Sequence, residues 1–434
     1  MAVTRLSVFL IGTASCLAAI PAPPVTAKVV GMNQAAESVT AARIAALPSA
    51  RRGVWTAYLA RSNAAMRADK AALAAERKPG LAIPPAPPTG NGVLTMPLDR
   101  PADWYAGAEA RRIADAVASF QTPSGGWGKN QPRGAARLPG QAYVSDNSNA
   151  AARPGDFDPT QSWHYVGTID NDATTHEIRF LARVAAGSGQ VAAARPYRAS
   201  AERGLRYLLD AQYPNGGWPQ VWPLEGGYHD AITLNDNAMA QVLDLLTDVA
   251  DGQGDFAFAP AALRTKARAA AARGVACILA MQVVRDGRRT GWGQQHDALT
   301  LAITSARNYE PAALAAPESA AVLRYLMGLP RRDPAVEGAI TAAADWLRAS
   351  AIHGQAWRDA GDGLGRRLIA DPAAPPVWAR FYTVAGNQPL FGDRDKTLHD
   401  DYMELSTGRR RGYAWFGTAP GAVLAAYDAR RQGS

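Results

Sequence analysis

The stretch Gln121-Thr122-Pro123-Ser124-Gly125-Gly126-Trp127-Gly128 recurs as Gln212-Tyr213-Pro214-Asn215-Gly216-Gly217-Trp218-Pro219, and more loosely from Gln282 to Gly291-Trp292-Gly293. Each copy follows the apolar end of a helix-like pattern. The three tryptophans lie 91 and 74 residues apart, which leaves room for one helical hairpin and a long loop. A helical pair cannot bury its apolar face alone, so repeated pairs must stack on one another.

Three such pairs closing on themselves predict a mainly α fold, an incomplete α/α toroid or (α/α)3 barrel with a few short strands and long decorated loops. We expect the glycine–tryptophan loops at one end of the toroid and a cleft at the other rim. The alternative is three unrelated helix ends, each with a left-handed glycine and a tryptophan plug. Helix starts are predicted at Pro317-Glu318 and at Pro334, and short strands near 163–169 and 377–384.

The composition permits a large core and favours an anionic partner. The chain has 434 residues, 47% of them apolar, and a net charge of +8. These values exclude a wholly disordered or fibrous protein, and the positive charge suits nucleic acid, anionic lipid or an acidic polysaccharide. No basic tract alternates with aromatic residues, and the longest basic run is only Arg409-Arg410-Arg411, so nucleic acid is not the expected partner.

The N-terminus has the pattern of a secretory signal. Arg5 supplies the positive charge, Leu6 to Ile20 the apolar segment, and Val25-Thr26-Ala27 the small-residue cleavage site. Cleavage after Ala27 predicts a secreted or periplasmic protein, and lipid attachment at Cys16 is the alternative. Cys277 would then be the lone cysteine, which rules out an intramolecular disulfide. No later segment is apolar for long enough to span a membrane.

The rest of the chain divides near residue 99. Residues 28–98 hold an Ala-rich helical segment and a Pro/Gly-rich stretch, which we interpret as a linker or an arm that wraps the core. Residues 99–434 form the predicted catalytic domain, and we expect a monomer.

Two acidic clusters precede helix-like runs. Gly167-Thr168-Ile169-Asp170-Asn171-Asp172-Ala173-Thr174-Thr175 places two carboxylates and an amide within three residues, and Leu234-Asn235-Asp236-Asn237 has a similar position. Asn and Asp commonly cap helices, but closely spaced oxygen ligands also hold hard cations such as Ca²⁺. The repeat should bring both clusters to one rim, which favours a shared site.

Other classes of site find little support. The six histidines show no zinc-ligand spacing, and neither a Gly-x-Ser-x-Gly elbow nor a phosphate-binding loop is present. Three arginines are more informative, namely Arg307, Arg380 and Arg394. Each could form a structural ion pair, but convergent arginine forks also match the carboxylates of a polyuronate.

Several stretches together resemble the family-10 pectate lyases. They are Thr168-Ile169-Asp170-Asn171-Asp172-Ala173-Thr174, Pro214-Asn215-Gly216-Gly217-Trp218-Pro219-Gln220, Ile232-Thr233-Leu234-Asn235-Asp236, Ser305-Ala306-Arg307-Asn308-Tyr309-Glu310, and Arg380-Phe381-Tyr382 followed by Phe391-Gly392-Asp393-Arg394-Asp395. The motifs keep the family's order from about residue 100 to the C-terminus. The resemblance implies an α/α toroid and calcium-dependent cleavage of polygalacturonate by β-elimination, which gives 4,5-unsaturated oligogalacturonides.

The resemblance also implies roles for individual residues. Arg307 corresponds to the catalytic base, Arg380 and Arg394 to binders of uronate carboxylates, and Asp170, Asn171, Asp172 and Asp236 to the calcium-binding residues. Whether Asp170 or Asp172 is the main ligand stays open. An arginine base is chemically unusual because a guanidinium is protonated at any ordinary pH, and chemistry alone would favour Lys, His or Tyr. A neutral guanidine would need hydrophobic, cation-rich surroundings and alkaline conditions.

Two other functions remain as alternatives. A glycoside hydrolase on the same scaffold would use Asp170 or Asp172, with Asp236, as acid and base. A non-catalytic periplasmic protein would bind uronates without turnover. Ultraviolet absorbance of an unsaturated product, measured with and without chelator, separates the three.

Overall fold

The computed structural model describes residues 28–88, 96–145, 163–189, 191–330, 333–361, 363 and 365–432. The predicted signal at 1–27, with Cys16, lies outside the described residues. Within the described part, no helix is long and apolar enough to cross a membrane. Cys277 is a buried core residue, as its apolar surroundings in the sequence indicate.

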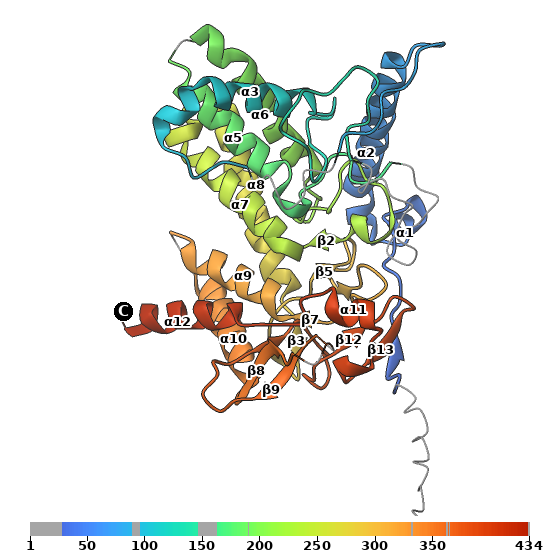
Figure 1. The fold of residues 1–434 in the computed structure, drawn as a ribbon, viewed down its shortest axis with the longest axis vertical. Helices are drawn as coiled ribbons and strands as arrows, with labels where there is room; N and C mark the ends of the chain where they lie inside the picture. The colour runs from blue at the N-terminus through green and yellow to red at the C-terminus, as the bar shows by residue number, and fades with distance from the viewer. Residues whose placement is uncertain are drawn as a thin grey trace, which may run out of the picture.

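Three helical hairpins form the body of the molecule (Figure 1). They are α5 (Thr175–Gly187) with α6 (Val191–Ala211), α7 (Ala238–Asp251) with α8 (Ala261–Met281), and α9 (Ala316–Gly328) with α10 (Pro334–Ala349). α3 (Ala108–Ser119) packs on α5, and α12 (Ala419–Gln432) packs on α9 and α10. The predicted mainly α, incomplete toroid is confirmed, as are the helix starts at Pro317 and Pro334.

Each repeated loop places a buried tryptophan under the end of the preceding helix. The indole Nε1 donates to a backbone carbonyl there, from Trp127 to Val117 at 2.7 Å, from Trp218 to Leu208 at 2.8 Å and from Trp292 to Ile278 at 2.8 Å. All three side chains are fully buried, and a buried indole N–H needs such a partner. The tryptophan therefore closes each helix end in the same way.

The glutamine that begins each copy joins neighbouring repeats. The Nε2 of Gln121 donates to Gly125 in its own loop at 2.8 Å and to Ser200 in α6 at 3.0 Å. Gln212 makes the same two contacts to Gly216 and to Ala270 in α8, and Gln282 to Thr290 and to Ala339 in α10. Three equal bridges make the loops true structural repeats and not three unrelated helix ends.

Short strands decorate the ends of the hairpins. One sheet joins β2 (Ile232–Thr233), β5 (Gln295–His296) and β6 (Ile303–Thr304), and the longest pair joins β8 (Gln355–Asp359) to β9 (Arg366–Ala370). The other pairs are β3 (Val284–Arg285) with β4 (Arg288–Arg289), β7 (Leu314–Ala315) with β11 (Phe381–Tyr382), β10 (Trp378–Ala379) with β14 (Phe416–Gly417), and β12 (Phe391–Gly392) with β13 (Thr397–His399). The strands expected at 377–384 are confirmed, whereas 163–169 forms only an isolated bridge between Thr168 and Val221.

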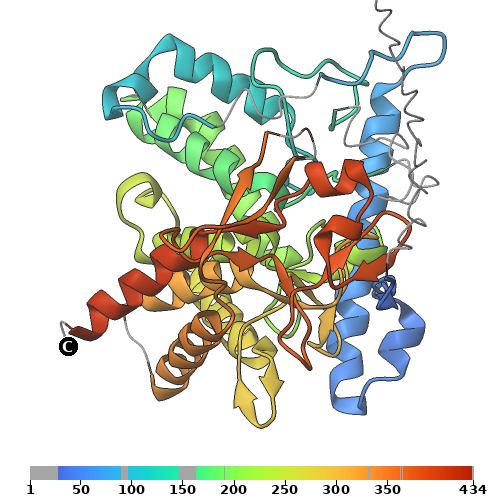
Figure 2. The same ribbon diagram turned by 60° about the horizontal axis from the view of Figure 1, so that its bottom comes forward.

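The N-terminal segment packs along one side of the hairpins, as Figures 1 and 2 both show. It contains β1 (Gly31–Met32), which pairs with β13, then α1 (Ala41–Ala45) and the long α2 (Ser49–Glu76). The Trp55 ring lies 5.2 Å from that of Tyr213, and the Tyr58 hydroxyl donates to the Ala211 carbonyl at 2.8 Å. Residues 28–76 therefore share the core of the repeats.

Candidate active site

The two acidic clusters adopt the same unusual backbone. Asp170–Asp172 and Asn235–Asn237 each form a 3₁₀ turn that contains left-handed residues, Asn171 at φ 51° and Asp236 at φ 49°. Asn and Asp tolerate this conformation better than other residues with a side chain. Neither α5 nor α7 receives a side-chain cap hydrogen bond at its N-cap. The clusters therefore present their polar groups at the hairpin ends for another purpose than capping.

A cavity of about 190 Å³ lies where these turns meet the glycine–tryptophan loops. Each loop contributes the residue two positions after its tryptophan, which is Lys129, Gln220 or Gln294. The expectation of a cleft at the rim away from these loops was wrong. Since such a loop precedes each of the three hairpins, the loops and the turns before α5 and α7 share one end of the toroid.

Asp170 is the most firmly held acid in the cavity. Its Oδ2 lies 2.8 Å from the Lys129 ammonium, and its Oδ1 accepts from Gln220 at 2.9 Å and from Asn235 at 3.3 Å. Burial of the carboxyl opposes ionisation, but Lys129 and these donors hold the pKa of Asp170 below its ordinary value. Asp170 is therefore a carboxylate that points into the cavity.

Asp236 lines the same cavity, but its surroundings favour ionisation less than those of Asp170 do. Burial, with the negative charge of Asp170 nearby, raises the pKa of Asp236 above its ordinary value. Its Oδ2 accepts from the Asn235 amide at 2.9 Å. Two carboxylates that repel each other in a buried cavity leave negative charge that a bound cation would compensate.

The other two predicted metal ligands lie apart from each other. Asn171 lines the cavity, and its Nδ2 donates to Asn130 Oδ1 at 3.2 Å. Asp172 points elsewhere, toward the Gln241 amide and toward His176 Nδ1 at 3.9 Å, and it does not line the cavity. The geometry thus groups Asp170, Asn171 and Asp236 and leaves Asp172 outside.

Arg307 faces the cavity from the loop after β6. Its Nε and an Nη donate to the two oxygens of Glu310 at 2.8 and 2.6 Å, and Glu310 also accepts from the Tyr413 hydroxyl at 2.6 Å. Although Arg307 is partly desolvated, the carboxylate beside it raises its pKa well above the ordinary value. This setting is anionic and not the cation-rich one that a neutral guanidine needs.

The two other predicted arginines have different surroundings. Arg380 is nearly buried behind the cavity, where it contacts Glu318 at 2.7 Å and donates to Asn235 at 3.2 Å. Arg394 lies on the surface side, with its guanidinium 5.8 Å from the Tyr309 ring centre. Neither residue lines the cavity itself. Arg380 supports the turn that carries Asp236, whereas Arg394 lies next to the Arg307 loop.

The donor set of the cavity suits a hard cation. Its potential ligands are oxygen atoms of carboxylates and amides, and its described lining residues include no histidine or cysteine. The side-chain oxygens of Gln220, Gln294 and Gln295 are buried without a hydrogen-bond partner in the described part of the protein. Among the described residues no three His, Cys, Asp or Glu side chains cluster as ligands, so amide oxygens, water or substrate would complete the shell. The residues present fit Ca²⁺.

Four functional candidates were missed by sequence reasoning. Lys129 not only pairs with Asp170 but also lies 3.8 Å from the Tyr165 ring centre, and Tyr165 and Tyr228 form an aromatic wall of the cavity. Glu310 stands within a motif that was quoted without a role for it. The constant offset after each tryptophan could have identified Lys129, because Lys129 follows Gly128 as Gln220 follows Pro219.

Comparison with known proteins agrees with this geometry. A family profile described as pectic acid lyase matches residues 121–424. Two structures of a family 10 polysaccharide lyase from Cellvibrio cellulosa are similar at 30% identity and a TM-score of 0.63. One is an aspartate-to-alanine mutant in complex with trigalacturonic acid, aligned over 77% of this chain and 98% of its own. The other aligns over 79% and 99%, respectively. No curated protein matches significantly.

Proposed function

Because this chain belongs to the pectic acid lyase family, and is therefore a polysaccharide lyase, we propose that it cleaves polygalacturonate by calcium-dependent β-elimination. The trigalacturonic acid bound by the Cellvibrio relative and the net charge of +8 support an acidic galacturonan as substrate. The family sets aside the alternative of a glycoside hydrolase. The signal pattern in the sequence supports export to the periplasm or the medium.

One observation carries the proposal. Asp170 and Asp236, from the turns before α5 and α7, meet Arg307, from the loop after β6, around one cavity. Carboxylates for a cation and a guanidinium for a uronate are the two kinds of group that an acidic sugar needs.

Asp170, Asn171 and Asp236 would hold the cation. Ca²⁺, when bound there, would supply charge neutralisation for the uronate carboxylate. Lys129 would have to leave Asp170 Oδ2 to free that oxygen, and its ammonium would then be available to a substrate oxygen. Gln220 and Asn235 keep Asp170 oriented throughout, because both donate to its other oxygen.

Arg307 is the proposed base in this β-elimination. The C5–H bond breaks, its electron pair forms the C4–C5 double bond, and the C4–O bond breaks as the leaving oxygen takes up a proton. For Arg307 to accept the C5 proton it must first release its own proton to solvent water or hydroxide, so its pairing with Glu310 has to weaken when substrate arrives. The proton acquired on the guanidinium would then restore the ion pair with Glu310, which stabilises the product state.

A spectrophotometric assay tests the proposal. Polygalacturonate with Ca²⁺ at pH 7 to 10 should give a rise in ultraviolet absorbance that chelator abolishes. Arg307→Ala should lower the rate by a factor of about 100 or more. Because it also leaves the buried Glu310 without its partner, the rate is compared per folded enzyme, well below the melting temperature of the variant. Reducing sugar without absorbance, or full activity in chelator, would contradict it.

A further inference from the structure

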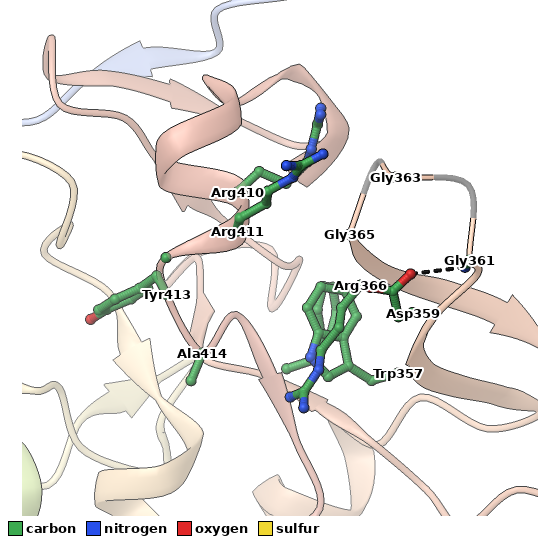
Figure 3. A pocket seen from close by; sticks show the side chains of 12 residues that line it. Trp357, Asp359, Gly361, Gly363, Gly365, Arg366, Arg410, Arg411, Tyr413 and Ala414 are labelled. Carbon is green, nitrogen blue, oxygen red and sulfur yellow. Dashed lines mark hydrogen bonds between the residues drawn. The ribbon is translucent and has the colours of Figure 1, made fainter. Parts of the chain in front are cut away.

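A second, larger pocket lies beside the active site (Figure 3). It has a volume of about 830 Å³ and opens between the β8–β9 hairpin and the segment from α11 (Thr407–Arg411) to β14. Volumes of this order accommodate ligands the size of several sugar units. Its chemistry is set by Arg366 on the hairpin, by Arg410 and Arg411 at the end of α11, and by the aromatic side chains of Trp357, Tyr413 and Phe416.

Among the described residues, the arginines of this pocket have no acidic partner. Within the described part of the chain, neither Arg366 nor Arg411 forms an ion pair, and Arg410 donates to the Met403 carbonyl at 3.0 Å and not to an acid. Asp359 is the one acid among the described lining residues, and its Oδ1 already accepts from the Gly361 amide at 2.8 Å. In the part of the chain that the structure describes, three guanidinium groups around this cavity therefore have no carboxylate partner.

The aromatic wall of this pocket is fixed by its own packing. The Trp357 ring lies 4.8 Å from Phe416 and 5.2 Å from Tyr402, so the half-buried indole has a defined orientation. The flat ring offers an apolar face, and the guanidinium groups beside it offer hydrogen-bond donors for a carboxylate. An acidic sugar presents the same two surfaces, because its C–H face is apolar and its carboxylate accepts bidentate hydrogen bonds.

Tyr413 connects this pocket to the active site. Figure 3 shows its side chain directed out of the pocket, away from Trp357 and Arg366. There its hydroxyl donates to Glu310, the residue that holds Arg307. Tyr413 therefore lines this pocket and contacts Glu310, which lines the active-site cavity.

We propose that this pocket is a distal subsite that binds the carboxylates of galacturonate units several sugars away from the bond that is cleaved. The inference rests on the proposed function, because it takes the polygalacturonate chain as the ligand. It adds a preference for long chains, since only an oligomer long enough to occupy both cavities would contact the active site and Arg366 and Arg411 together.

Binding without turnover tests the subsite. Calorimetry would compare trigalacturonate and hexagalacturonate in chelator, with constant ultraviolet absorbance to show that no product forms. The variant is Arg366→Ala/Arg411→Ala, which leaves the hydrogen bond of Arg410 in place. The matched control is Arg285→Ala/Arg288→Ala, which removes two arginines from the β3–β4 hairpin elsewhere on the surface.

We expect the wild type to bind the hexamer at least ten times more tightly than the trimer. The pocket variant should lose that advantage and keep its affinity for the trimer, whereas the control should behave as the wild type. Arg366→Lys/Arg411→Lys should recover only part of the advantage for the hexamer, because lysine keeps the charge but cannot donate two hydrogen bonds to one carboxylate as a guanidinium does. Equal hexamer affinity in the pocket variant, an equal loss in the control, or equal binding of a methyl-esterified hexamer would each overturn the subsite.

The two proposals fail in different ways. Absence of ultraviolet product from the wild type with Ca²⁺ would overturn the proposed reaction, whatever the pocket binds. A normal rate of product formation together with unchanged hexamer affinity in the pocket variant would overturn the subsite alone. A wild type that binds the hexamer no better than the trimer would also overturn the subsite.

Discussion

Glu310 holds Arg307 through both of its carboxylate oxygens, at 2.6 and 2.8 Å, and so keeps the proposed base protonated before substrate binds. Glu310→Gln removes the negative charge that raises the pKa of Arg307, so the neutral guanidine should become available at lower pH. We expect the limb on which kcat/KM rises with pH to move down by about one pH unit. The maximal rate should also fall, because Arg307 loses its fixed orientation.

Tyr413→Phe is the control for this shift. It removes a hydrogen bond to the same carboxylate but leaves the charge of Glu310 in place. Its pH profile should therefore stay close to that of the wild type. If Glu310→Gln leaves the profile unmoved as well, Arg307 does not act as the base.

The proposed calcium site distinguishes Asp236 from Asp172. Asp236→Asn removes one of the two carboxylates that line the cavity and should weaken Ca²⁺ binding at least tenfold, because Ca²⁺ affinity follows ligand charge. Asp172→Asn should change it less than about twofold, because Asp172 contacts Gln241 and His176 outside the cavity. Calorimetric titration with Ca²⁺ measures both. A large loss in Asp172→Asn would return that residue to the ligand set.

Arg380 and Arg394 should respond differently to truncation. Arg380→Ala leaves the buried Glu318 without its partner, so unfolding in denaturant should show a loss of about 3–5 kcal/mol. Arg380→Met with Glu318→Leu should recover most of it, since both charges are gone. Arg394→Ala should cost less than about 1 kcal/mol but raise KM for polygalacturonate. A stable Arg380→Ala protein with raised KM would give Arg380 the direct substrate role instead.

The repeat in the sequence was sufficient to predict the toroid. Gln121, Gln212 and Gln282 recur because each must satisfy a loop carbonyl and a carbonyl of the next hairpin. Such a local requirement leaves a visible pattern. The short strands were harder to predict, because two-residue pairings such as β2 with β5 depend on where the loops meet and not on alternation of apolar residues.

The candidate site was predictable in its acids but not in their partners. Asp170 and Asp236 stand out because each lies in an acidic cluster before a helix. The lysine that pairs with Asp170 comes from a loop 41 residues earlier, and only the fold brings it to 2.8 Å. Similarly, the orientation of Asp172 away from the cavity depends on left-handed residues in its turn, which the sequence permits without requiring.

Asp69 should make stability depend on pH. Burial in α2 raises the pKa of Asp69 to about 6, with Oδ1 accepting from the Ser124 amide at 2.8 Å. The folded state thus favours the protonated form of Asp69. The free energy of unfolding should therefore fall as the pH rises from about 4 to about 6 and stay at the lower value above pH 6. The total decrease should be at most about 3 kcal/mol. Asp69→Asn should therefore be more stable than the wild type at pH 8 and no more stable at pH 4. Parallel denaturation curves at both values check this, and an equal difference at both would contradict it.

Asn33 should affect catalysis from outside the cavity. Its side-chain amide, only 7% exposed, donates to the backbone carbonyls of Arg307, Asn308 and Glu310 at 3.2, 2.9 and 3.2 Å. The N-terminal segment thereby fixes the loop that carries the proposed base. Asn33→Ala should lower kcat about tenfold with a smaller change in KM, because loose positioning of a reacting group costs rate.

The same segment provides the control for Asn33. Within the described part of the chain, the Gln34 side chain donates to Met32 alone, at 3.5 Å, so Gln34→Ala should keep the wild-type kcat. A purely structural role for Asn33 would lower the melting temperature and leave kcat of the folded fraction intact. Measuring kcat and Ca²⁺ affinity well below the melting temperature separates the two cases. Unchanged kcat in folded Asn33→Ala would show that the loop holds Arg307 in place without the N-terminal segment.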